Sequence, residues 1–222
     1  MDAITSDDMA RMDSLAINKY NIKILQMMEL AGYNLSRLVN RLLDFTTESM
    51  KTLVLAGKGN NGGGGLSASR HLKNLGFNVE VILAQESSLR DPSFHHLDTL
   101  KQMKVPISVF ENKGLPEADI FVDALLGYGL RGEPREPIAR LIREMNESNG
   151  NIISLDVPTG LNTSTAEIMD PCVRASYTMT LAYPKIGLSE NPEFVGELYI
   201  ADIGLPRELY KEMGLERPEF FM

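Results

Sequence analysis

The sequence predicts an α/β fold, namely a three-layer, Rossmann-like, doubly wound and mainly parallel sheet with two N-terminal helices. Apolar residues repeat at helical spacing within residues 1–50, before any strand-like run. From Lys51 onward, short β-rich runs alternate with amphipathic segments, a pattern typical of βαβ units. The 222 residues suffice for one sizeable core. We therefore expect a single domain over 1–222, with the N-terminal helices in 1–50 and a Rossmann-like body in 51–222.

The two N-terminal helices are expected on different grounds. Ser6, Asp7 and Asp8 would supply a cap and first-turn acids for the first helix. The second is expected over about 19–43, where four apolar residues share one helical face. These residues are Ala31, Leu35, Leu38 and Leu42. That face is expected to pack on the body of the domain.

Seven strands are expected in the body, separated by helices. The strands are 52–56, 79–84, 107–110, 120–125, 151–155, 177–182 and 198–203. One helix is expected over 66–75, since Gly76 is a residue type common just after a helix. Asp91 would cap a second helix with Pro92 at its first position, and a third would include 138–145.

Composition excludes several classes of protein. The charge of −8, from 22 basic and 30 acidic residues, shows no basic patch for nucleic acid. The one cysteine, Cys172, has no internal disulfide partner. The apolar runs fall short of the roughly 20 residues that a membrane span needs, and residues 1–13 are acidic where a secretory signal would be basic. We expect a cytoplasmic protein that binds neither nucleic acid nor membrane.

The first candidate site is the glycine-rich segment 57–66 after the first strand. Gly57, Gly59 and Gly62 fit the dinucleotide-binding spacing G-x-G-x-x-G, and a helix follows. Glycines allow close backbone approach, and a helix N-terminus attracts anions. A phosphate-bearing ligand is therefore favoured here over a tight turn without a ligand.

A second candidate is Asp123, which lies within an otherwise apolar strand. A buried carboxylate is costly unless a cation or hydrogen-bond donors compensate it. Both readings, metal ligation and capping of backbone N–H groups, stay open at this point. The segment 127–133 that follows is expected to be a mobile loop that contacts ligand, with Arg131 able to meet a phosphate.

The third candidate, Asp156, is the strongest single residue. It ends the fifth expected strand, where a rigid element would hold a catalytic acid or base at the ligand crevice. The alternative is an Asx-turn that shapes the corner at 158–160. Lys185, after the next strand, is expected to be a solvated surface charge. The histidines lack metal-ligand spacing, so zinc is not expected.

Four segments taken together resemble one family. They are Met27-Met28-Glu29-Leu30-Ala31-Gly32, residues 59–66, residues 122–129 and Asp156-Val157-Pro158-Thr159-Gly160. Their order and placement are similar to the YjeF N-terminal domain family, the NAD(P)H-hydrate epimerases. The resemblance implies a Rossmann-like isomerase that interconverts the R and S epimers of NADH or NADPH hydrated at C6 of the nicotinamide ring. A separate dehydratase that accepts the S form would then restore the cofactor.

The resemblance also implies roles for individual residues. The substrate would be bound by Asn60, Asn61, Gly62, Gly63, Gly64, Gly127, Tyr128, Gly129, Leu130, Arg131, Gly132, Glu133 and Asp156. Asp156 would be the acid/base group, and one K⁺ ion would be held by Asn61, Asp123 and Thr159. Oxygen ligands of this kind suit a hard cation. The chain departs from the family at Gly64, where an Asp is usual, and at Tyr128, where a Thr is usual.

The sequence also leaves two alternative functions and one assembly open. An NAD(P)-dependent oxidoreductase would use Glu86 as its ribose-binding acid. A catalytically inactive nucleotide-binding or protein-interaction module would explain Gly64. The family also suggests a homodimer through the N-terminal helices, for which Met27 and Met28 would provide apolar contacts. The motifs occupy nearly all of the chain, so a fused dehydratase domain is not expected.

Overall fold

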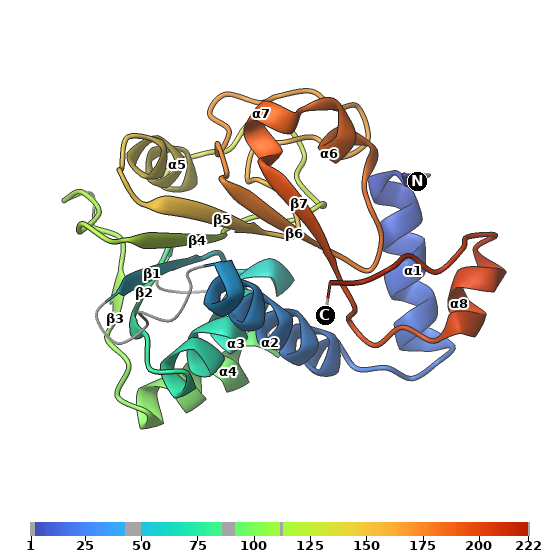
Figure 1. Cartoon of the computed structure of the whole chain (residues 1–222), viewed down its shortest axis with the longest axis horizontal. Coiled ribbons are helices and arrows are strands. Elements are labelled where there is room, and N and C mark those ends of the chain that lie inside the picture. Colours follow the sequence, from blue (N-terminus) through green and yellow to red (C-terminus); the bar gives the residue numbers. More distant parts are fainter. Residues whose placement is uncertain (1–2, 43–49, 86–91, 112, 222) are drawn as a thin grey trace.

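A single seven-stranded sheet forms the centre of the molecule (Figure 1). The computed structural model describes residues 3–42, 50–85, 92–111 and 113–221. The strands are β1 (Lys51–Ala56), β2 (Asn78–Leu83), β3 (Ile107–Val109), β4 (Ile120–Ala124), β5 (Asn151–Leu155), β6 (Tyr177–Leu181) and β7 (Glu197–Ala201). Their spatial order is β3-β2-β1-β4-β5-β6-β7, and each neighbouring pair is parallel. The doubly wound fold is confirmed, with its reversal of strand order between β1 and β4.

Helices cover both faces of the sheet, which confirms the three layers. They are α1 (Ser6–Asn18), α2 (Ile24–Leu42), α3 (Asn60–Asn74), α4 (Ser93–Gln102), α5 (Ile138–Asn146), α6 (Ile186–Glu190), α7 (Pro192–Val195) and α8 (Arg207–Glu212). In Figure 1, α2, α3 and α4 lie below the sheet and α5, α6 and α7 above it, while α1 and α8 stand at one side. The three short helices α6, α7 and α8 were not expected from the sequence pattern.

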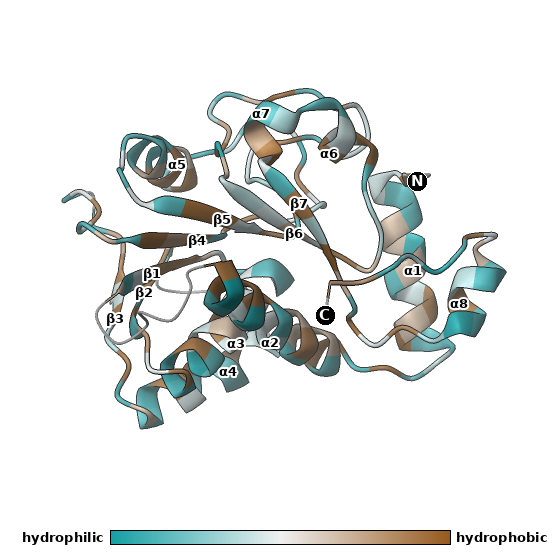
Figure 2. Ribbon diagram, viewed as in Figure 1, coloured by the Kyte–Doolittle hydropathy of each residue, from teal (hydrophilic) through white to brown (hydrophobic). Residues whose placement is uncertain are grey.

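Alternate residues of the central strands pack into different cores. On β1, Val54 and Ala56 join the cluster under α2 and α3, whereas Leu53 and Leu55 join the cluster that contains the buried face of α5. Strands buried on both faces read as continuous apolar runs, and Figure 2 shows β1 and β4 as largely hydrophobic. The seven predicted strands are confirmed, with bounds that differ by at most two residues.

The N-terminal helices differ from their expected bounds. Thr5, not Ser6, is the N-cap of α1, because its side chain accepts from the Asp8 backbone while the Asp8 carboxylate accepts from the Thr5 backbone. The second helix begins at Ile24, not near residue 19, since Asn21 has a left-handed φ of 54° that interrupts the helical path. The apolar face of α2 packs on the body as expected, mainly against α3.

The glycine run lies inside a helix and not in a loop, so the prediction that α3 begins at residue 66 is wrong. Glycine has a low helix propensity, but tertiary packing overrides it here. A Cβ at Gly62 would lie 1.8 Å from the Gly57 carbonyl oxygen, and one at Gly65 would lie 2.4 Å from Cβ of Ala124. The glycines therefore let α3 approach β1 and β4 closely.

Two other expectations concern the segment before α4. The helix begins at Ser93 with Pro92 as its N-cap, so Pro92 is one position earlier than predicted. Asp91, the expected cap, lies outside the described residues, as does Glu86. The helix around 138–145 is confirmed as α5.

Candidate functional site

A cavity of about 470 Å³ opens at the carboxyl ends of β1, β4 and β5. It lies beside the reversal of strand order, where doubly wound sheets bind ligands. Its wall combines residues of α1, α2, the start of α3 and the segments after β4 and β5. They are Met9, Asp13, Ile24, Met27, Met28, Ala31, Lys58, Gly59, Asn60, Asn61, Gly64, Leu125, Leu126, Gly127, Tyr128, Gly129, Leu130, Leu155, Asp156, Leu181 and Ile203.

Asp156 brings a carboxylate to this wall from the first position after β5. Its backbone has a left-handed φ of 70°, a conformation that non-glycine residues adopt at a cost and that clusters at functional sites. Oδ2 accepts from the Tyr128 backbone N–H at 2.9 Å, and Oδ1 accepts from Nζ of Lys185 at 2.6 Å. The carboxylate thus faces partners from distant segments, and neither of these hydrogen bonds forms the Asx-turn at 158–160 that was the alternative interpretation.

Lys185 is fully buried, so its prediction as a solvated surface charge is wrong. Besides Asp156, its ammonium donates to Oγ1 of Thr180 at 2.9 Å and to the Leu181 carbonyl at 2.8 Å. A buried lysine needs such compensation. One sequence signal pointed this way, because Lys185 lies between the apolar pairs Tyr183-Pro184 and Ile186-Gly187.

Asp123 is completely buried and satisfied by hydrogen-bond donors. Its oxygens accept from the backbone N–H groups of Leu125 and Thr159 and from the hydroxyls of Ser154 and Thr159, at 2.7–3.3 Å. Burial raises the pKa of Asp123, while the hydrogen bonds from Thr159 and Ser154 act in the opposite direction. Backbone capping, one of the two readings of this residue, is therefore present in the structure.

Asn61, on the first turn of α3, approaches the same region. Its side-chain amide forms no hydrogen bond with any described residue, and Nδ2 is buried. Gly127 packs between this amide and Asp156: a Cβ at Gly127 would lie 2.8 Å from Oδ2 of Asp156 and 3.5 Å from Cβ of Asn61. A side chain at residue 127 would displace the Asp156 carboxylate, so glycine suits this position.

Asp13 is a second carboxyl group on the cavity wall, and the sequence did not identify it. It lies on α1, and its Oδ2 accepts a 2.6 Å hydrogen bond from the Tyr128 hydroxyl. Burial raises the pKa of Asp13, and the negative charge of Asp156 raises it further, against the effects of Tyr128 and Lys185. No spacing in the sequence connects α1 with residue 128, so only the fold brings them together.

The structure brings most of the predicted site residues together. On the cavity wall lie Asn60, Asn61, Gly64, Gly127, Tyr128, Gly129, Leu130 and Asp156, together with Lys58. Asp123 and Thr159 are buried, and Thr159 also contacts the Leu126 backbone, which lines the cavity. Gly62 and Gly63 are buried in the packing of α3. Arg131, Gly132 and Glu133 are exposed and do not line the cavity.

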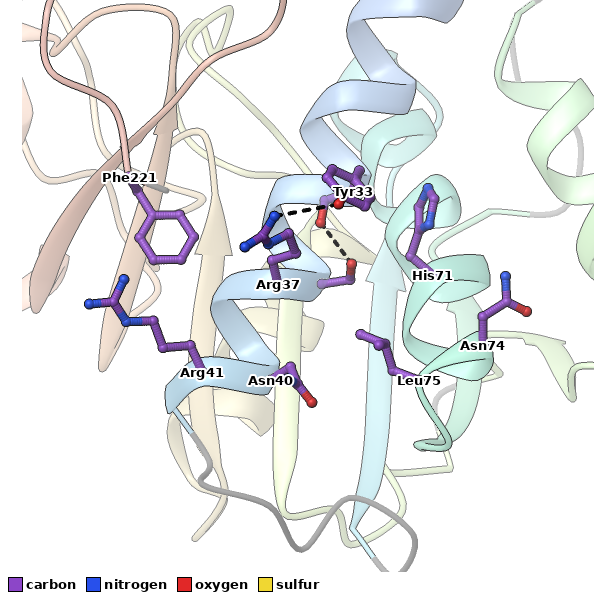
Figure 3. Close-up of a pocket in the computed structure, with 9 residues that line it drawn as sticks. Tyr33, Arg37, Asn40, Arg41, His71, Asn74, Leu75 and Phe221 are labelled. Carbon is purple, nitrogen blue, oxygen red and sulfur yellow. Dashed lines mark hydrogen bonds between the residues drawn. The ribbon is translucent and has the colours of Figure 1, made fainter.

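Two further cavities lie away from these residues. One of about 380 Å³ lies between α2 and α3 and is lined by Tyr33, Ser36, Arg37, Asn40, Arg41, His71, Asn74, Leu75 and Phe221 (Figure 3). A shallow one of about 980 Å³ includes Lys51, Asp119 and Asn151, at the opposite ends of the strands. Neither contains a predicted site residue.

A known protein family matches most of this chain. The family model described as "YjeF-related protein N-terminus" matches residues 24–187, most of the chain and all of the segments 59–66, 122–129 and 156–160. The chain belongs to the YjeF-related family. Asp13 lies outside the matched range, as does the whole of α1.

Members of the YjeF-related family are similar over nearly the whole chain. A protein of Dehalogenimonas lykanthroporepellens named NAD(P)H-hydrate epimerase is 41% identical, over 96% of this chain and 86% of its own length. One of the same name in Rhodopirellula baltica is 32% identical, over 96% and 88%. A bifunctional NAD(P)H-hydrate repair enzyme Nnr of Moorella thermoacetica is 33% identical, and the chain spans only 41% of its length.

The YjeF-related fold is also found in a solved structure. The crystal structure of yeast ynu0 matches with a TM-score of 0.89 and 26% identity, over 100% of this chain and 97% of that one. In the part of the chain that the structure describes, no helix combines the length and the apolar character needed to cross a bilayer. Met27 and Met28 are buried inside the protein and line the cavity, so the predicted intersubunit contact through these two residues is wrong.

Proposed function

We propose that this chain interconverts the R and S epimers of hydrated NADH and hydrated NADPH, as an isomerase of cofactor repair. The proposal is supported by its similarity to relatives named NAD(P)H-hydrate epimerase. The observation that carries it is the Asp156 carboxylate on the cavity wall, paired with the buried Lys185 behind it. This pair holds a carboxylate in a defined orientation at a ligand-sized site.

The reaction requires proton transfer to and from the oxygen bound to C6. The hydroxyl leaves as water after it accepts a proton, and the lone pair of the ring nitrogen forms a C=N double bond to C6. Water then adds to C6 from the other face and loses a proton, which restores the hydrate with inverted configuration. Asp156 is proposed as an acid/base group for these transfers, because its carboxylate lines the cavity and is fixed by Tyr128 and Lys185.

The remaining wall is proposed to bind the dinucleotide. Asn60, Asn61 and Gly64 lie at the start of α3, where backbone N–H groups and the helix dipole favour phosphate oxygens. Lys58 adds a positive charge in a protein of net charge −8. The segment 127–130 lines the opposite side of the cavity, and the exposed Arg131, Gly132 and Glu133 continue it toward solvent. Gly62 and Gly63 contribute through the packing that allows this approach.

A K⁺ ion is proposed at Asn61, Asp123 and Thr159. Their donor set fits a hard cation, because it combines amide, carboxylate and hydroxyl oxygens. No described residue forms a hydrogen bond with the side-chain amide of Asn61. The Asp123 side chain is fully buried. When bound, the cation would neutralise that carboxylate and order the turn that carries Thr159 and Asp156.

The partners proposed for this chain follow from the product. A separate dehydratase that takes the S epimer would complete the repair, and the bifunctional relatives are named for NAD(P)H-hydrate repair. We also propose a homodimer, but through surfaces other than Met27 and Met28. The proposed location is the cytoplasm.

The decisive experiment follows the purified R epimer of hydrated NADH by chiral chromatography. The wild-type protein should form the S epimer faster than the spontaneous reaction, and Asp156→Asn should lose this acceleration. Asp98→Asn, an exposed carboxyl on α4, is the matched control and should keep it. A wild-type protein without acceleration would refute the proposal and favour an inactive binding module, for which Gly64 on the cavity wall is the specific observation.

A further inference from the structure

We infer that Asp13 is a second catalytic acid/base group of this chain, acting on the face of the nicotinamide ring opposite to Asp156, with Tyr128 as the residue that positions it. The inference rests on the proposed epimerase function and extends it. It assigns a role to α1, which lies outside the segment matched by the family model.

Tyr128 connects the two carboxyl groups of the cavity. Its backbone N–H donates to Asp156 at 2.9 Å, whereas its hydroxyl donates to Asp13 at 2.6 Å. Its own carbonyl accepts from the Thr163 hydroxyl at 3.3 Å, which holds the residue in place. Tyr128 therefore bridges the two carboxyl groups, and all three residues line the same cavity.

Two carboxyl groups on the wall of one cavity suit a reaction that uses both faces of one carbon. Enzymes that invert configuration at a sugar carbon place two carboxyl groups far enough apart to hold the substrate and a water molecule between them. Inversion at C6 has the same requirement, because the hydroxyl leaves from one face and water arrives on the other. One acid/base group for each face avoids a rotation of the intermediate within the cavity.

The two carboxyl groups lie in different electrostatic environments. Asp156 is a carboxylate paired with the Lys185 ammonium. Burial raises the pKa of Asp13, as does the charge of Asp156, so Asp13 retains a proton to higher pH than an ordinary aspartate. Among the described residues, only the Tyr128 hydroxyl donates a hydrogen bond to the Asp13 carboxyl, and this hydrogen bond reaches Oδ2. Oδ1 is therefore available to a ligand.

The proton balance is complete with water as the only co-reactant. Protonated Asp13 gives its proton to the C6 hydroxyl as the C–O bond breaks, the electron pair stays on the departing water, and the ring nitrogen donates its lone pair to C6. A solvent water then bonds to C6, and its proton passes to the Asp156 carboxylate. The reverse reaction uses the same groups in opposite roles, and both regain their starting states by exchange with solvent.

The test uses four full-length proteins and the purified R epimer of hydrated NADH. Asp13→Asn should lower kcat by about 10²- to 10⁴-fold with little change in KM, which is the effect of losing one acid/base group. Asp7→Asn makes the same chemical change at an exposed position of α1 and should keep wild-type rates. In H₂¹⁸O, the wild-type product should carry ¹⁸O at C6.

Tyr128→Phe separates catalysis from folding, because it keeps the Asp13 carboxyl and removes the hydrogen bond that lowers its pKa. The wild-type kcat/KM should fall at high pH as Asp13 loses its proton, and in Tyr128→Phe this fall should move to higher pH. The other charged groups that act on Asp13, Asp156 and Lys185, are unchanged in this variant. If circular dichroism shows that Asp13→Asn does not fold, the shift of the pH profile in Tyr128→Phe tests the role of Asp13 by itself.

Three results would overturn the inference: wild-type kcat in a folded Asp13→Asn, an unshifted fall in Tyr128→Phe, or a product without solvent ¹⁸O. Each of these results counts against the inference only if the wild-type protein accelerates epimerisation. A wild-type protein that does not accelerate epimerisation refutes the proposed function itself, so the two failures are distinguishable.

Discussion

Replacing Lys185 by methionine should destabilise the protein strongly. The two side chains have similar length, but methionine cannot donate a hydrogen bond or carry a charge. In the native protein the Lys185 side chain is 0% exposed and that of Asp156 is 5% exposed. The substitution therefore leaves the Asp156 carboxylate buried without its cation, and it removes the donor that serves Thr180 and Leu181.

The expected magnitude follows from this burial. Removing one partner of a buried ion pair costs about 3–5 kcal/mol, because the remaining charge stays uncompensated. For a chain of this size, each kcal/mol lowers the melting temperature by about 2–4 °C. Lys185→Met should therefore lower it by roughly 6–20 °C.

Urea unfolding followed by circular dichroism measures the effect, and a double-mutant cycle identifies its cause. Asp156→Asn in the Lys185→Met background removes the stranded charge, so the double variant should be more stable than Lys185→Met alone. The coupling energy should be about 1–3 kcal/mol. Additivity of the two single substitutions within about 0.5 kcal/mol would show that the ion pair contributes nothing, and would refute the reasoning.

Three other predictions concern separate regions. Gly62→Ala should destabilise the protein by at least about 1–3 kcal/mol, since its Cβ would lie 1.8 Å from the Gly57 carbonyl oxygen, whereas Gly59→Ala has open space and should stay within about 0.5 kcal/mol in urea unfolding. Burial opposes the charge of Glu29, but hydrogen bonds from neighbouring side chains outweigh it and lower its pKa to about 2. Glu29→Gln should therefore cost up to about 1 kcal/mol at pH 7, and the difference should vanish as the pH falls from about 4.5 to 2, because the unfolded chain takes up the proton first. Burial raises the pKa of the Cys172 thiol to about 12, so a thiol reagent should label the native protein far more slowly than the urea-unfolded one.

The fold was predictable from the sequence because its signals are local. Seven β-rich runs and the apolar face of α2 follow from periodicity within single segments. The start of α3 was not predictable in this way, since a run of glycines is a poor helix former in isolation. Its helical state depends on contact with Gly57 and Ala124, which only the packed structure supplies.

Some residues of the candidate site are also recognisable from local sequence signals, whereas others are not. Asp156 and Asp123 were identified because a carboxylate at or within an apolar strand is unusual in any sequence. The burial of Lys185 was not predictable, because a lysine after a strand is exposed in most proteins and its partner Asp156 lies 29 residues away. Asp13 and Tyr128 are 115 residues apart, and neither stands out on its own element.

By itself, the sequence determined the doubly wound α/β fold, the end of the sheet where the candidate site lies and the family resemblance, because each depends on residues close together in the chain. Only the tertiary structure decided how the charges in that cavity are compensated. Donors from the strand and the following turn surround Asp123, Lys185 neutralises Asp156, and Tyr128 links Asp156 to Asp13. These groups are brought together from segments far apart in the chain, and no local sequence pattern records such contacts.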